Sequence, residues 1–137
     1  MDAKKAVKRH LMRGSCCSEA LIRFGLELLQ EDEDERLTSA ASALCNGMFS
    51  GGVCGGLTGG CLLLGMVDRS AAPELCQEFC EWFDVTVASR YASVYCRDIL
   101  GEDPWNKIER CQPMIMEIAD KCQELLVEHG LIEEGEG

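Results

Sequence analysis

Apolar residues recur along most of the chain at intervals of three and four positions, which is the spacing of one face of an α-helix. A first such face runs over residues 3–11 and ends near Gly14. A second runs over residues 17–28, and Ser15 is its expected N-cap. Strict alternation of apolar and polar residues is almost absent, so the pattern does not indicate β-strands.

The same periodicity predicts the rest of the architecture. A third helix is expected over residues 37–45, after an acidic run, and a fourth over 54–67. A fifth opens at Ala72-Pro73 and reaches about Leu100, with a shift of its apolar face that predicts a bend or a new packing partner. The last begins at Pro113 and ends at Gly130. We therefore expect an all-α single domain over residues 1–137, a compact bundle of five or six helices, with a flexible acidic tail at 133–137.

The fourth helix is unusually rich in glycine. Glycines repeat every four residues in two registers, 51, 55, 59 and 52, 56, 60. Each interior glycine costs about 1 kcal/mol of helix propensity, so close packing must offset that cost, and the helix is expected to be central. A stripe without side chains admits either another backbone or a cofactor, which makes Gly55, Gly56 and Gly59 candidate cofactor contacts. The uncharged stretch 47–67 contains eight glycines, so we expect a buried helix there rather than a membrane span.

Composition adds two facts that change this picture. The formal net charge is −11, which argues against nucleic acid as a partner, because phosphate binding needs a basic surface. The chain also contains ten cysteines. The basic N-terminal segment has no apolar core of the kind that marks a secretory signal, so we expect a cytoplasmic protein without static disulfides. The sulfurs are then buried thiols, metal ligands or redox-active groups.

Three cysteines are predicted to lie at helix N-termini: Cys17, Cys54 and Cys111. Free amide groups and the positive end of the helix dipole lower the pKa of a thiol in such a place, which raises its thiolate fraction at neutral pH. The alternative is that these residues are small buried hydrophobes, because free cysteine is among the most buried residue types. Spacing alone leaves both interpretations open.

The remaining candidates are weaker. Cys76 and Cys80 lie four residues apart on one helical face and could share a metal ion, although core packing beside Phe79 and Phe83 is the favoured explanation. Cys16 is expected to be more exposed than its neighbour and could act as a resolving thiol. His10 could serve as a base or ligand, but a lone histidine on an inner face is more often packed. For three further cysteines we expect packing roles: Cys45, Cys61 and Cys122.

The order of the motifs resembles that of the C-GCAxxG-C-C family, a family of single domains of about this length to which a redox role is assigned. The resemblance covers nearly the whole chain. Its most specific part is the middle motif at 51–59, with Cys54 followed by Gly55-Gly56-Leu57-Thr58-Gly59. The flanking parts are Cys17-Ser18-Glu19-Ala20-Leu21, then Tyr95-Cys96-Arg97-Asp98-Ile99-Leu100-Gly101, then the isolated Cys111.

The resemblance implies that Cys17, Cys54, Cys96 and Cys111 form the functional set. Cys96 falls near the end of the expected fifth helix, where the dipole disfavours a thiolate, so it could resolve a disulfide begun by Cys17 or Cys54. The chain departs from the family in having Gly56 where alanine is usual. It also has six additional cysteines, namely Cys16, Cys45, Cys61, Cys76, Cys80 and Cys122.

Three classes of function follow. The first is a thiol redox protein that exchanges dithiol and disulfide with a partner protein or a small thiol, or that transfers electrons. The second uses the same four cysteines to bind zinc or an iron–sulfur cluster. The third is a helical interaction module whose cysteines only pack. The sequence leaves open whether the protein is an enzyme and whether its glycine face supports a homodimer.

Overall fold

The computed structural model describes residues 1–133 and is an all-α bundle over that range, so the tail expected from residue 133 onward lies outside it except for its first residue. The α-helices are α1 (Ala3–Met12), α2 (Cys17–Leu28), α3 (Glu35–Ser42), α4 (Gly55–Val67), α5 (Ala72–Phe83), α6 (Ser89–Tyr91), α7 (Cys96–Leu100) and α8 (Gln112–Glu128). Three short segments of wider π-type turns join them: η1 (Gly47–Gly51), η2 (Asp84–Ala88) and η3 (Lys107–Cys111).

Local sequence explains most helix ends. The carboxylate of Asp2 accepts a hydrogen bond from the Lys5 amide and caps α1, and Asp34 caps α3 through the Leu37 amide. Proline occupies the first turn of α5 and of α8, where its missing N–H is not needed. One prediction was wrong in detail, because α2 has Cys16, not Ser15, as its N-cap residue.

The expected fifth helix is two helices. From α5 the chain continues through η2 and α6 without interruption, and the π-type turns of η2 account for the predicted shift of the apolar face. The helix then ends at Ala92, which has a left-handed φ of 54°, and α7 begins only at Cys96. Counting α5 to α6 as one, the described residues form seven helices, more than the five or six expected.

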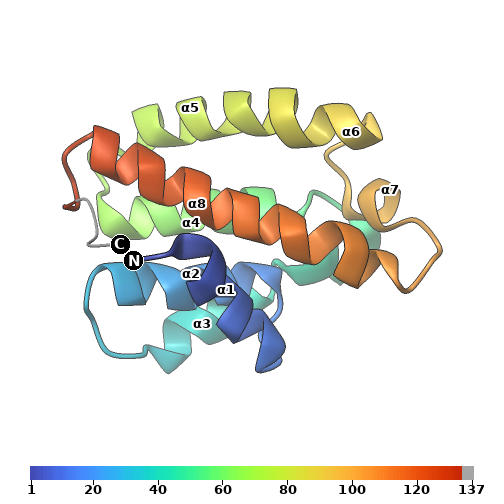
Figure 1. Cartoon of the computed structure of the whole chain (residues 1–137), viewed down its shortest axis with the longest axis horizontal. Helices are drawn as coiled ribbons and strands as arrows, with labels where there is room; N and C mark the ends of the chain where they lie inside the picture. The colour runs from blue at the N-terminus through green and yellow to red at the C-terminus, as the bar shows by residue number, and fades with distance from the viewer. Residues whose placement is uncertain (134–137) are drawn as a thin grey trace.

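The glycine-rich helix α4 packs against α2, α5 and α8 (Figure 1). In this view α5 lies on one side of the bundle, α1 to α3 lie on the other, and α8 crosses in front. The close packing depends on missing side chains, because a Cβ on Gly59 would lie 2.9 Å from Ser18 and one on Gly56 2.7 Å from Ile118. Within residues 1–133, no helix is long and apolar enough to cross a membrane.

Candidate functional site: a pocket lined by thiols

Four cysteines that are far apart in sequence meet at one pocket. Cys17 begins α2, Cys54 is the N-cap of α4, Cys96 begins α7, and Cys111 ends η3 just before α8. All four line a cavity of about 390 Å³. Most of its other walls are apolar: Leu11, Ile99, Leu100, Pro104, Ile108 and Met114. The four residues picked out by the family resemblance are therefore brought together by the fold.

A short backbone pairing brings Cys54 and Cys96 to the same wall. Val53 and Tyr95 form an antiparallel bridge between two extended residues. On either side of it, the Cys54 amide donates to the Val94 carbonyl at 2.8 Å, and the Cys96 amide donates to the Gly52 carbonyl at 2.7 Å. The prediction that Cys96 lies near a helix C-terminus was wrong, because the helix breaks at Ala92 and the chain pairs in extended form before α7.

The segment before α4 has an unusual backbone that contacts Cys17. Asn46, Gly47, Met48 and Phe49 all have φ between 54° and 59°, which is a left-handed turn that costs energy at non-glycine residues. The turn directs the Asn46 backbone amide toward the Cys17 thiol, where it favours the thiolate. The sequence predicted no helix between residues 45 and 54 but gave no sign of the strain.

The position of Cys111 in the pocket is fixed by two side chains that hydrogen-bond to backbone carbonyls of α7. The buried Asn106 donates to the Leu100 carbonyl at 2.7 Å, and Arg110 donates to the Ile99 carbonyl at 2.9 Å. These bonds connect η3 to the end of α7 and so place Cys111 beside the other three thiols. Both residues were missed by sequence reasoning, because their partners are backbone carbonyls that become available only where α7 ends.

Burial dominates the acidity of the four thiols. It raises the pKa of Cys54 to about 11, despite the Gly56 amide that donates to its Sγ at 3.3 Å. Burial is also the largest cause of the raised pKa values of Cys17, Cys96 and Cys111. The prediction that helix N-termini lower the pKa values of Cys17, Cys54 and Cys111 was wrong. The loss of hydration outweighs the amide hydrogen bonds at Cys17 and Cys54, and at Cys111 burial acts together with the charges of the neighbouring thiolates.

The charges around the pocket couple its thiols to one another. A thiolate at Cys17 raises the pKa of Cys54, Cys96 and Cys111. The opposing positive charge comes from Lys107, an exposed residue of η3 that also lines the pocket and acts to lower the pKa of Cys17, Cys96 and Cys111. The pocket therefore accommodates one thiolate much more easily than two.

A disulfide borders the same pocket. Cys16 and Cys45 are bonded to each other, with their Cα atoms 6.1 Å apart, and both line the cavity. The packing role expected for Cys45 was wrong, because its sulfur is bonded to that of Cys16. The buried Ser18 hydroxyl donates to the Ala41 carbonyl at 2.7 Å, and its oxygen lies 3.0 Å from the Cys45 Sγ. Sequence reasoning could not find the pair, because its members are 29 positions apart and two helices, α2 and α3, lie between them.

The three candidate glycines have different surroundings. Gly55 lines the pocket, and a Cβ at that position would lie 2.7 Å from the Cys17 Sγ and 2.7 Å from the Leu44 carbonyl oxygen. Gly56 faces isoleucines of α8, and Gly59 faces Ser18 on α2. The close approach that the glycine stripe permits is thus taken by protein atoms, and only Gly55 reaches the cavity.

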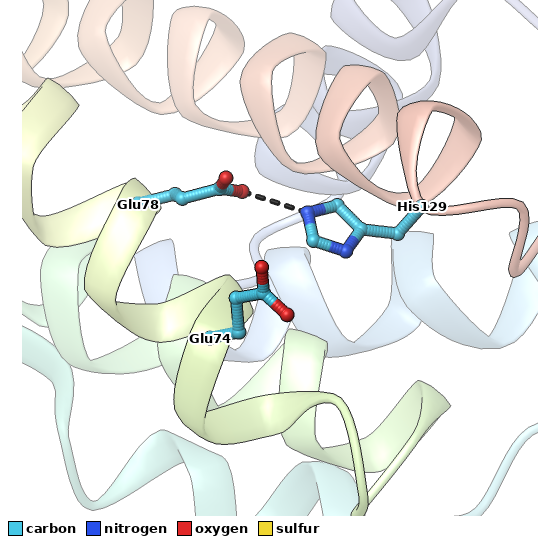
Figure 2. Close-up of side chains that lie close together, drawn as sticks. All are labelled: Glu74, Glu78 and His129. Carbon is cyan, nitrogen blue, oxygen red and sulfur yellow. Dashed lines mark hydrogen bonds and ion pairs between the residues drawn. The ribbon is translucent and has the colours of Figure 1, made fainter.

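Side chains that are close enough together to bind one metal ion lie outside the thiol pocket. Among the described residues, the only three potential ligand atoms found within 4.8 Å of one another belong to Glu74, Glu78 and His129. Figure 2 shows His129, at the end of α8, facing these two glutamates of α5, with a His129 Nε2 to Glu78 distance of 2.8 Å. This exposed pair is explained as an ion pair, since Glu78 raises the pKa of His129.

The other candidates also lie outside the pocket. Cys76 and Cys80 are on α5, near Cys61 of α4. The buried His10 contacts Glu27 near the far end of α2, about 15 Å along that helix from Cys17, and so is not placed as a base for this thiol.

Together the bundle and its pocket define a small helical protein with a multi-thiol site. The pattern of the C_GCAxxG_C_C family, described as "Putative redox-active protein", matches residues 15–125. The chain therefore belongs to this family. Comparisons with curated proteins and with solved structures gave no match.

Proposed function

We propose that the protein carries out dithiol–disulfide exchange in the pocket formed by Cys17, Cys54, Cys96 and Cys111. The observation that supports this most strongly is that the four cysteines, from four separate segments, line one cavity. In the reaction, two pocket thiols become one disulfide, while a disulfide of a partner protein or a small molecule becomes two thiols. The two protons of the pocket thiols pass to the two sulfurs that leave, so atoms and electrons balance.

The electrostatics of the pocket give this exchange an order. One thiol ionises near Lys107 and attacks the external disulfide. This sulfur loses its negative charge when it forms the mixed disulfide. It therefore no longer raises the pKa of the neighbouring thiols. A second thiol therefore ionises more easily and displaces the remaining sulfur. We take Cys96 as one member of the pair, with Cys17 or Cys54 as the other.

Zinc binding by the same four cysteines fits the geometry less well. A zinc ion needs three or four sulfurs about 2.3 Å from one centre. In the described part of the chain no three cysteine sulfurs lie within 4.8 Å of one another, so a zinc site would require them to move. An iron–sulfur cluster spreads its cysteine ligands over several irons, so this spacing does not count against it. Exchange requires only that two sulfurs meet. One zinc or several irons per chain, measured on protein purified without chelator or oxygen, would favour the metal alternative.

A reducing, cytoplasmic location is part of the proposal. Disulfides of proteins in that compartment are usually transient and redox-active rather than structural. On this view the Cys16–Cys45 disulfide, which borders the pocket, exchanges with the pocket thiols instead of persisting. Whether the protein turns over a substrate as an enzyme or carries electrons between partners depends on the identity of the external disulfide.

The proposal can be tested on Cys96 directly, because trypsin places this cysteine alone in peptide 91–97. The protein is equilibrated with mixtures of reduced and oxidised small dithiol, then alkylated and digested. We expect alkylation of Cys96 to fall as the mixture becomes oxidising and to return on reduction. Cys76→Ser, which changes a cysteine outside the pocket, should leave that curve unchanged. Full alkylation of Cys96 across the whole range would contradict the proposal.

A further inference from the structure

We propose that Cys61 and Cys80 form a second thiol–disulfide site, outside the pocket, that reduces a small-molecule disulfide and becomes a disulfide between α4 and α5. Both residues belong to the six cysteines that the family pattern does not include. The site does not line the thiol pocket and does not depend on the chemistry proposed there.

The two sulfurs already face each other. The Sγ atoms of Cys61 and Cys80 lie 3.8 Å apart, and both side chains are half-buried, so they are neither sealed in the core nor separated by solvent. Cys61 is on α4 and Cys80 is on α5, 19 residues later. A disulfide requires the sulfurs to close to about 2 Å, a movement that side-chain rotation can supply when the backbones are near.

The backbones are near at this level of the bundle. The residues just before the two cysteines, Gly60 and Phe79, are in direct contact, and the phenyl ring occupies the place where a Cβ on Gly60 would be. Because Gly60 has no side chain, α4 and α5 approach closely one residue before each thiol. The same contact fixes the two helices against each other at the level of the two thiols.

Two neighbouring cysteines are placed differently. The Cys76 thiol, one turn earlier on α5, donates to the Cys61 carbonyl oxygen at 3.7 Å and also interacts with the Cys61 thiol. Cys122 of α8 is fully buried and points to the Gly60 carbonyl at 4.0 Å. Cys76 is therefore the competing partner for Cys61, and the test must distinguish it from Cys80.

The reaction has a defined order and balance. Cys80 loses its proton and attacks the small disulfide, which releases one small thiol and leaves a mixed disulfide on Cys80. Burial and the neighbouring sulfurs raise the pKa of Cys61, and part of that effect is lost once Cys80 is bonded. Cys61 then ionises, attacks the Cys80 sulfur and releases the second small thiol. Two protein thiols and one disulfide thus become one protein disulfide and two small thiols.

The test uses oxidised glutathione on the fully reduced protein, followed by alkylation and digestion without reductant. Trypsin places Cys61 in peptide 37–69 and Cys80 in peptide 70–90. We expect these two peptides to be linked, with fragmentation locating the bond at Cys61 and Cys80. Alkylation of both cysteines at glutathione concentrations that oxidise Cys96 would overturn the proposal, and it would leave the pocket chemistry intact.

Three variants show which two cysteines form the bond, and each variant is checked for helix content by circular dichroism. Cys80→Ser should abolish the link, and Cys76→Ser should retain it. Cys61→Ser should leave glutathione attached to Cys80, because the resolving thiol is gone. A link that survives in Cys80→Ser and is lost in Cys76→Ser would overturn the pairing, as would an unmodified Cys80 in Cys61→Ser.

Discussion

At the residue scale, the acidity of a cysteine in this protein depends more on its burial than on its position in a helix. Cys54 has both an N-cap position and an amide donor, and burial still raises its pKa to about 11. A helix terminus can be predicted from sequence, but the depth of a side chain depends on which segments cover it. The sequence therefore singled out four sulfurs that the fold brings to one cavity, but it predicted the wrong sign for the pKa shifts of Cys17, Cys54 and Cys111.

Lys107 provides the pocket's opposing charge, so removing it should make the thiols less reactive. We expect Lys107→Met to lower the rate of Cys96 alkylation at pH 8 by about two- to threefold, as expected for a partly screened charge several ångströms away. The rates should converge at high pH, where the thiol is ionised in both proteins. Lys5→Met removes a similar charge from α1 and should leave the rate unchanged; equal effects of the two substitutions would contradict a specific role for Lys107.

Gly55 separates α4 from the Cys17 sulfur, and a methyl group at this position has no room. Gly55→Ala should lower the free energy of unfolding by about 1–3 kcal/mol, because both the sulfur and the Leu44 carbonyl would have to move. The matched control is Gly65→Ala on the same helix, where the new Cβ meets only Ala72 at 4.0 Å. That variant should gain up to about 1 kcal/mol from helix propensity. Denaturant unfolding of both would show whether the effects have opposite signs.

At the element scale, the site depends on the places where helices stop. The break between Ala92 and Cys96 permits the Val53–Tyr95 bridge, and the left-handed turn at 46–49 brings the Asn46 amide to Cys17. The periodicity of residues 72–100 predicted one long helix, because no proline or glycine interrupts it after Pro73. Tertiary pairing overrides that local preference, and single-sequence patterns contain little information about it.

The strain of the left-handed turn can be measured at Phe49. Its φ is 57° and its side chain is 69% exposed, so it has an unfavourable backbone with little burial to compensate. Phe49→Gly should stabilise the protein by about 1 kcal/mol. Val85→Gly, at a residue of η2 that is 76% exposed, should instead destabilise it by about 1 kcal/mol. A loss of stability in Phe49→Gly measured by thermal unfolding would mean that the turn is not strained.

At the scale of the whole molecule, the bundle brings six cysteines to one cavity, four as thiols and two as a disulfide. The all-α class, the glycine-rich helix and the family set of cysteines followed from the sequence. The disulfide and the Cys61–Cys80 contact did not, since each joins residues whose distance depends on how separate helices pack. Their discovery required the three-dimensional arrangement of α2 and η1 in one case and of α4 and α5 in the other.

The Cys16–Cys45 disulfide closes a long loop and should contribute to stability as well as to chemistry. Its members are 29 positions apart in the sequence, so its reduction should lower the free energy of unfolding by about 3–4 kcal/mol. The thermal midpoint of the wild-type protein should therefore fall when a dithiol reductant is added. Cys16→Ser should start at the lower midpoint and show no further change. An equal response of both proteins to reductant would assign the effect to other sulfurs.

The most direct test of the account is the identity of the cysteine that bonds to Cys96 in mildly oxidised protein. After digestion without reductant, peptide 91–97, which contains only Cys96, is searched for a linked partner by mass spectrometry. The account predicts a link to a pocket cysteine, with Cys17 or Cys54 as the expected partner, and its disappearance on reduction. Oxidised protein in which Cys96 is bonded to none of Cys17, Cys54 and Cys111 would contradict a shared redox pocket.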